Sequence, residues 1–266
     1  MSRRVLAAVV LVAATAAPAA LAAAEEVKTI PTRPGVTQSF LLLRRSETPA
    51  ATVILFAGGD GALGLDAEGR MSSLGGNFLV RNRGRFAEHG LMVAVPDAPS
   101  DHARGLARFR ASREHAEDIR ALIAALRATA PAPVWLVGTS MGTVSAANGA
   151  ARLREGGPDG LVLTSTITRW NRSQGESIGD VKLKDIAVPT LVVHHREDAC
   201  PFTPFSDIPG LMRELSKAPR RELLTFEGGE PPQSAPCEAR AAHGYLGLDA
   251  QVVKAIADWI VTTRRP

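Results

Sequence analysis

The pentapeptide Gly138-Thr139-Ser140-Met141-Gly142 is the part of the sequence whose residue types and spacing best suit a chemical reaction. It follows the apolar run of residues 133–137 (PVWLV) and precedes a helix pattern rich in small residues. A serine on such a sharp strand-to-helix turn has a strained backbone. Glycine is needed two positions to either side, because a Cβ there would collide with the neighbouring strand and helix. We therefore predict that Ser140 is a nucleophile, the alternative being an ordinary glycine-rich turn.

Short apolar runs alternate with helix patterns through the rest of the chain. The runs do not alternate polar with apolar residues, which is typical of strands covered on both faces. This order predicts an α/β fold with a mostly parallel, doubly wound sheet and helices on both faces, in a single domain over residues 25–266. The predicted strands cover residues 37–43, 51–57, 91–95, 133–137, 161–164, 190–194 and 222–226, and the predicted helices cover residues 110–129, 141–153, 211–217 and 249–262.

Two segments of the chain are predicted to be irregular. Residues 60–83 are rich in glycine and arginine and are expected to lie over one end of the sheet. Residues 170–181 are polar and too few to form a lid domain. We therefore expect a minimal cap and an open site.

The N-terminus has the layout of an export signal. Ser2-Arg3-Arg4 is a short basic region, residues 5–17 are apolar, and Ala22-Ala23-Ala24 supplies the small residues that signal peptidase accepts. We predict that residues 1–24 are a cleaved signal peptide and that the mature protein is periplasmic or extracellular, with the Sec and Tat routes both open. The alternative is a membrane anchor, which Pro18 and the weakly apolar alanines disfavour.

The composition is that of an ordinary soluble globular protein, with 45% hydrophobic and 22% charged residues. The formal net charge of +4 would fall to +2 once Arg3 and Arg4 are removed with the signal. So small a charge, with few aromatic residues and none interleaved with basic stretches, argues against a nucleic-acid partner. The oligomeric state is not readable from the sequence.

The chain has two cysteines, Cys200 and Cys237. In an oxidising compartment an even pair predicts a disulfide, and two free thiols are the alternative.

We expect neither a cofactor nor a metal ion. His194, His195, Glu197 and Asp198 are close in sequence, but adjacent strand residues point to opposite faces, and no HExxH or Cys–His zinc spacing is present. The run Gly58-Gly59-Asp60-Gly61 has no following Gly-Lys-Ser/Thr, which argues against nucleotide binding.

With this serine motif between a strand and a helix, residues 37–264 resemble the α/β-hydrolase superfamily. In that family the chain order is nucleophile, acid, histidine, with the acid after a late strand and the histidine before the last helix. The resemblance implies that Asp198 is the acid and His243 is the base, completing a Ser-Asp-His triad with Ser140. Glu197 is the alternative acid.

The other histidines fit the family order less well. His194 and His195 come too early in the chain to be the base. Surface or helix-end positions account for His89 and His115, whereas His102 follows Pro96-Asp97 in a loop from which it could touch a substrate.

The family resemblance also implies an oxyanion hole made of two backbone N–H groups. One belongs to Met141, which follows the nucleophile, and the other to the loop after residues 51–57. There Ala57-Gly58-Gly59 aligns with the His-Gly-x pattern of many relatives and points to Gly59, with Asp60 as the alternative. The chain departs from that pattern in having Ala57 where histidine is frequent.

A bridge between Cys200 and Cys237 would join the two loops that carry the predicted acid and base. Cys200 is two residues after Asp198, and Cys237 is six residues before His243. We expect such a bridge to hold the acid and the base in register.

The predicted reaction is acyl transfer to water through an acyl-Ser140 intermediate. Hydrolysis of a carboxylic ester, in a small molecule or an accessible polymer, is the leading expectation because it is the commonest outcome on this fold. Amide, thioester or lactone hydrolysis, or acyl transfer to an alcohol, would use the same residues. A non-catalytic binding protein that keeps the fold is the competing class, although all three triad positions are filled.

Overall fold

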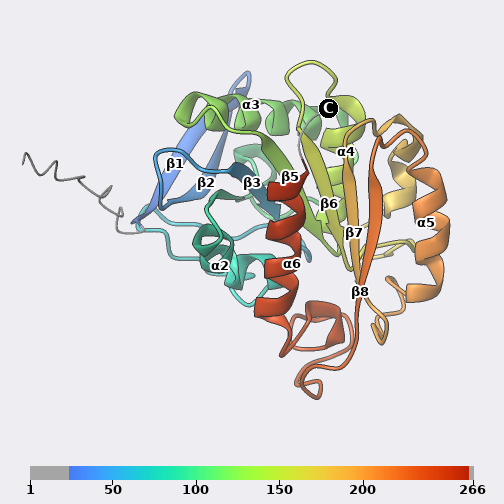
Figure 1. Ribbon diagram of the computed structural model, residues 1–266. Helices are drawn as coiled ribbons and strands as arrows, with labels where there is room; N and C mark the ends of the chain where they lie inside the picture. The colour runs from blue at the N-terminus through green and yellow to red at the C-terminus, as the bar shows by residue number, and fades with distance from the viewer. Residues whose placement is uncertain (1–23, 264–266) are drawn as a thin grey trace, which may run out of the picture.

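The computed structural model describes residues 24–263, and in this range the chain forms an eight-stranded sheet (Figure 1). The strand order is β1-β2-β4-β3-β5-β6-β7-β8. All neighbours from β4 to β8 are parallel, whereas β2 runs antiparallel to both β1 and β4. The predicted signal peptide, apart from its last residue, lies outside the described residues. The strands are β1 (Ala24–Arg33), β2 (Val36–Arg44), β3 (Ala51–Phe56), β4 (Leu91–Pro96), β5 (Val134–Thr139), β6 (Gly160–Thr164), β7 (Thr190–His195) and β8 (Arg221–Phe226).

Helices cover both faces of the sheet, as predicted (Figure 1). The side chains of α3, α4 and α5 pack on one face, and those of α1, α2 and α6 pack on the other. The helices are α1 (Phe78–Arg81), α2 (Arg83–Glu88), α3 (Arg113–Thr129), α4 (Gly142–Arg152), α5 (Ile208–Glu214) and α6 (Asp249–Thr262), with 3₁₀ turns at Ser100–His102, Ile178–Asp180, Leu183–Asp185, Phe205–Asp207 and Ala242–Gly244.

The central strands are buried on both sides. In β3 the side chains of Ile54 and Phe56 enter the core under α3 and α4, while Val53 and Leu55 enter the core under α1, α2 and α6. Every residue of β3 is therefore buried. This explains why strands such as β3 and β4 read as unbroken apolar runs in the sequence, and the α/β prediction is confirmed.

The structure differs from the sequence-based expectation mainly at exposed elements. Strand β1 was not predicted, because it is an edge strand whose sequence (AEEVKTIPTR) is mostly polar and contains Pro31. The segment predicted to be irregular up to residue 83 contains the short helix α1. Helix α5 begins three residues earlier than expected, because Pro209 lies in its first turn, where a missing N–H costs little.

The turn between β5 and α4 is the tightest crossing of helix and sheet. Ser140 has a φ of +51°, in the left-handed region that non-glycine residues rarely adopt. A Cβ on Gly138 would overlap the carbonyl oxygen of Gly142, and a Cβ on Gly142 would overlap the carbonyl oxygen of Phe56. The steric need for both glycines is thus present in the structure.

We predict that Gly142→Ala destabilises the fold, whereas Gly84→Ala does not. The added methyl of Gly142→Ala must displace backbone of β3, and overpacking of this kind costs about 1–3 kcal/mol or more. Gly84 lies in α2 with no atom near its Cβ position, so alanine should be neutral or stabilise by up to about 1 kcal/mol. Urea denaturation followed by circular dichroism measures both, and equal stabilities would contradict the steric account.

Candidate functional site

Ser140 and His243 line the same small cavity at the carboxyl end of the parallel strands. The cavity has a volume of about 50 Å³. Ser140 is half-buried, and its Oγ makes no hydrogen bond to a described residue. The remaining lining residues come from the loop after β3, the start of α1, the end of β5 and the loop before α6: Gly58, Gly59, Asn77, Phe78, Thr139, Cys237, Ala239 and Gly244.

Asp198 and His243 form a buried hydrogen-bonded pair. The distance from His243 Nδ1 to Asp198 Oδ2 is 2.9 Å. Thr203 Oγ1 donates to the same carboxylate oxygen at 2.8 Å, and the Cys200 N–H donates to Oδ1 at 3.0 Å. The structure therefore brings Asp198 and His243 together as the sequence predicts. Glu197 is exposed and instead accepts the Gly228 N–H.

The pKa of the Asp198 carboxyl lies below its ordinary value. Burial favours the neutral acid, but the hydrogen bond and the charge of His243, with the donors at Cys200 and Thr203, outweigh burial. Asp198 is thus a carboxylate at neutral pH. A carboxylate at Nδ1 fixes the tautomer in which Nδ1 carries the proton and Nε2 is free to accept one.

The backbone around His243 is anchored from β6 and β7. Ser165, which follows β6, donates its hydroxyl to the His243 carbonyl at 2.7 Å. Tyr245 is fully buried with a φ of +56°, and its hydroxyl donates to the Val193 carbonyl of β7 at 2.9 Å. Burial raises the pKa of this phenol, so it remains a donor. These contacts fix the 3₁₀ turn on which His243 lies.

The other histidines have structural partners away from the cavity. His194 Nε2 is 2.9 Å from the Thr203 carbonyl, and burial lowers the pKa of His194 despite the nearby Asp198. His195 Nε2 is 3.0 Å from the Gly228 carbonyl. Both side chains are buried.

The histidines before β5 are likewise separate from Ser140. His115 is buried in α3, where desolvation and the nearby Arg110 charge lower its pKa to about 3. His102 stacks on Phe109 with ring centroids 3.6 Å apart, and His89 follows the last residue of α2. None of the three lines the cavity within the described part of the chain.

The loop after β3 places Gly59 beside the serine. Gly58 lies against Ser140, since a Cβ on Gly58 would be 3.0 Å from the Ser140 Cβ. Gly59 and Met141 both have backbone N–H groups without a hydrogen-bond partner among residues 24–263. Asp60 instead lines a separate hollow with His102, and its carbonyl accepts the Leu106 N–H. Gly59 lines the cavity of Ser140, whereas Asp60 is not among the described residues that line it.

Arg110 is a buried residue that sequence reasoning missed. Its guanidinium donates to the Gly59 carbonyl at 3.1 Å and to Ser145 Oγ of α4 at 3.0 Å, so it joins the β3 loop to the helix that follows Ser140. Burial lowers its pKa to about 10, which leaves it charged at neutral pH. A Cβ on Gly61 would lie 2.5 Å from Arg110 Nη2, which explains the glycine at that position.

The predicted disulfide between Cys200 and Cys237 is present. It connects the loop of Asp198 to the loop of His243, and Cys237 also lines the cavity. Because 37 residues separate the two cysteines, the bridge restricts a long loop in the unfolded chain.

We predict that Cys200→Ser, Cys237→Ser and the double variant are each less stable than the oxidised protein by about 4 kcal/mol, the loop-entropy value for a loop of this length. The three variants should be equal, because each removes the same cross-link. Urea denaturation with and without reductant measures the loss of unfolding free energy. Reductant should lower the denaturation midpoint of the disulfide-bonded protein and leave the midpoints of the three variants unchanged. Equal stability of oxidised and reduced protein would contradict the prediction.

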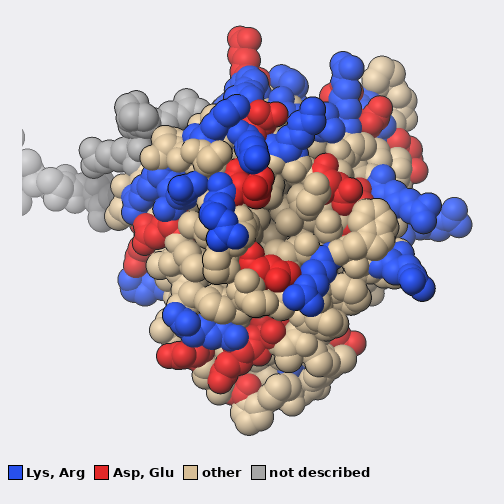
Figure 2. All heavy atoms as spheres, turned by 90° about the vertical axis from the view of Figure 1, so that its right-hand side faces the viewer, with Lys and Arg blue, Asp and Glu red and all other residues tan. Residues whose placement is uncertain are grey.

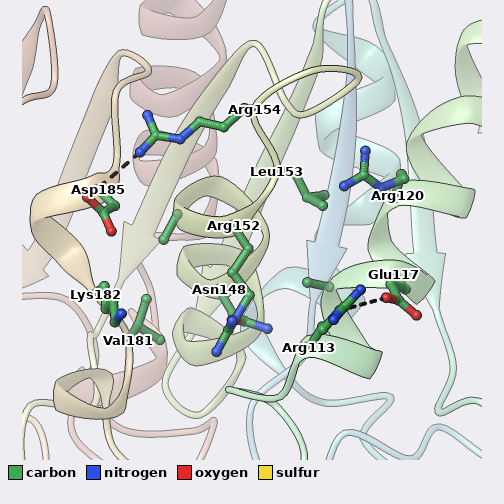
Figure 3. A pocket seen from close by; sticks show the side chains of 12 residues that line it. Arg113, Glu117, Arg120, Asn148, Arg152, Leu153, Arg154, Val181, Lys182 and Asp185 are labelled. Carbon is green, nitrogen blue, oxygen red and sulfur yellow. Dashed lines mark hydrogen bonds and ion pairs between the residues drawn. The ribbon is translucent and has the colours of Figure 1, made fainter.

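A larger hollow of about 440 Å³ lies between α3, α4 and the 3₁₀ turns that precede β7. The face shown in Figure 2 carries basic and acidic side chains interspersed, whereas basic side chains predominate in the lining of this hollow. Arg113 pairs with Glu117, and Arg154 pairs with Asp185 (Figure 3). No serine, threonine, cysteine or histidine is among its described lining residues, so it offers no nucleophile or base.

Comparison with solved structures places the fold among hydrolases. A cold-adapted esterase from an Arctic intertidal metagenomic library aligns with a TM-score of 0.59 and 14% identity, over 90% of this chain and 94% of that chain. An esterase from Pyrococcus furiosus aligns with a TM-score of 0.61 and 14% identity, over 90% and 93%. An α/β serine hydrolase without lid from Xanthomonas campestris aligns with a TM-score of 0.57 and 17% identity, over 92% of this chain and 98% of that chain. The chain has the α/β-hydrolase fold.

At these identities the comparisons show the fold alone. No protein-family model and no curated protein sequence matches the chain. Among the described residues, no group of three or more His, Cys, Asp or Glu side chains is arranged to hold a metal ion. None of the described helices is long and apolar enough to cross a membrane.

Proposed function

We propose that this α/β-hydrolase-fold protein is a serine hydrolase that cleaves carboxylic esters. The observation that carries the proposal is the Asp198–His243 hydrogen bond beside a cavity that also contains the strained, unpaired Ser140. These groups occur in the chain order nucleophile, acid, base that α/β-hydrolases use. The esterases among the structural neighbours make ester hydrolysis the leading reaction class.

In the proposed mechanism, Ser140 Oγ attacks the ester carbonyl while His243 Nε2 takes its proton. The tetrahedral oxyanion accepts hydrogen bonds from the N–H groups of Gly59 and Met141. As the intermediate collapses, the bond to the alcohol breaks and His243 returns the proton to the leaving oxygen, which leaves acyl-Ser140. A water molecule deprotonated by His243 then attacks the acyl carbon, and the carboxylic acid and free Ser140 are released.

Asp198 stabilises the imidazolium that forms on His243 in each step. Its pKa lies below the ordinary carboxyl value, so it is ionised at neutral pH.

We further propose that the protein acts after export. The Cys200–Cys237 disulfide supports this, because such bridges persist in oxidising compartments. The export signal on which the proposal also rests lies outside the described residues.

We predict that a fluorophosphonate probe labels the wild-type protein and leaves Ser140→Ala unlabelled. Turnover of p-nitrophenyl acetate should be lost in Ser140→Ala and reduced about 10²–10⁴-fold in His243→Ala, the range for removal of a general base. Ser173→Ala, which removes an exposed hydroxyl from a loop outside the cavity, is the matched control and should behave as wild type.

Gel fluorescence and initial rates read out these experiments. Absence of labelling in folded wild-type protein would refute the proposal and favour the competing possibility, a non-catalytic binding protein on the same fold. Labelling with turnover of an amide, thioester or lactone in place of esters would keep the nucleophile and replace the substrate class.

A further inference from the structure

Asn77 is a second polar side chain that faces Ser140. It is the N-cap of α1, and its Oδ1 accepts the Leu79 N–H at 3.1 Å. This bond fixes the orientation of the carboxamide, because a capping atom must be an acceptor and the amide nitrogen is not one. The Nδ2 group therefore points to the other side, away from the helix.

The Nδ2 group of Asn77 is directed at the cavity that contains the serine. A Cβ on Gly58 would be 3.4 Å from Asn77 Nδ2 and 3.0 Å from Ser140 Cβ, so the two side chains contact the same point of the β3 loop. Asn77 and Ser140 both line the cavity. Nδ2 makes no hydrogen bond to any residue from 24 to 263. Nδ2 is thus a hydrogen-bond donor of fixed orientation, without a partner among the described residues, beside the proposed nucleophile.

The walls of the cavity limit what can bind beside Asn77. Its volume of about 50 Å³ is far below the roughly 300–1,000 Å³ of sites for drug-sized ligands. Phe78 is buried and packs on Tyr245 with ring centroids 4.8 Å apart. Gly244 is buried against the Ala239 carbonyl, with which an added Cβ would overlap, and the disulfide joins Cys237 to the loop of Asp198. The cavity as it stands therefore has room only for a small group beside Asn77.

We propose that the site takes esters with a short acyl group, of about acetyl to propionyl size, and that Asn77 Nδ2 donates a hydrogen bond to the carbonyl oxygen of that group. The proposal rests on the proposed ester hydrolysis and names its acyl specificity and a further catalytic residue. As Ser140 attacks, the carbonyl oxygen becomes negative, and the Asn77 bond strengthens alongside those from the Gly59 and Met141 N–H groups. The alcohol part of the ester lies outside the cavity.

The structure offers two substitutions that keep the helix cap and remove the Nδ2 amide group. In Asn77→Asp and Asn77→Ser the new side chain still presents an oxygen to the Leu79 N–H, so stability should stay close to wild type. Asn171→Asp is the control for the added charge, because Asn171 Oδ1 also accepts backbone N–H groups but lies outside the cavity.

The experiment measures kcat and KM for p-nitrophenyl acetate, butyrate and octanoate, together with Tm. For wild type we expect kcat/KM to fall at least about tenfold from acetate to octanoate, because the longer acyl chain must be accommodated in a cavity that is already filled by a short one. Asn77→Ser should lower kcat on acetate about 10²-fold with KM and Tm little changed, as for loss of one oxyanion donor. Because serine is smaller, it should also raise the ratio of butyrate to acetate turnover. The kcat on acetate should fall further in Asn77→Asp and should be unchanged in Asn171→Asp.

The outcomes separate this proposal from the one on which it rests. Labelling of Ser140 by fluorophosphonate with equal rates on octanoate and acetate would overturn the short-acyl specificity while leaving a serine hydrolase. A kcat for Asn77→Ser within twofold of wild type would overturn the role of Asn77. Failure of Ser140 to label at all would overturn both proposals together.

Discussion

The close approach of α4 to the ends of β3 and β5 is the constraint on which the rest of the site depends. Gly142 lies against the carbonyl oxygens of Phe56 and Ala57, and Gly138 lies against Gly142. The chain can make this turn only by giving Ser140 a positive φ. The serine therefore points away from the sheet, and the loop that leaves β3 must pass directly beside it.

Long-range contacts then stabilise each loop that meets at this turn. Arg110 holds the Gly59 carbonyl to α4, and Asp97 at the end of β4 accepts the N–H groups of Leu63 and Leu65 in the same β3 loop. On the opposite side, Thr203 and the disulfide fix the loop of Asp198. The mechanism that we propose needs catalytic groups that are in position before the substrate binds. These contacts hold the loops that carry those groups.

The sequence predicts the parts of the structure that depend on local pattern. Strands such as β3 are buried on both faces and so read as apolar runs. The glycines at 138 and 142 are required by close backbone contacts within the five-residue turn around Ser140, so the motif itself predicts the turn. Edge strand β1 lacks that signal because it is partly exposed and polar. The pairing of Asp198 with His243 was predicted from the family order of such residues, not from any local pattern, and their catalytic roles stay a proposal.

Residues such as Arg110, Thr203 and Asn77 could not be predicted in the same way. Arg110 contacts a carbonyl 51 positions away, and its only trace in the sequence is the glycine at position 61 that makes room for it. Thr203 has a weak signal, since a hydroxyl five residues after Asp198 can return to its carboxylate. Asn77 resembles an ordinary helix cap, and its second role depends on the fold of the β3 loop.

Trapping of the acyl-enzyme tests the central claim most directly. His243→Ala protein mixed with p-nitrophenyl acetate should slowly accumulate one acetyl group, because p-nitrophenolate leaves without a proton from the histidine, whereas the water that releases the acetyl group needs the missing base. Intact-mass analysis followed by peptide mapping locates the added acetyl group. The account predicts that it lies on Ser140 and is absent from the Ser140→Ala, His243→Ala double variant. An acetyl group on another residue, or one that persists in the double variant, would contradict it.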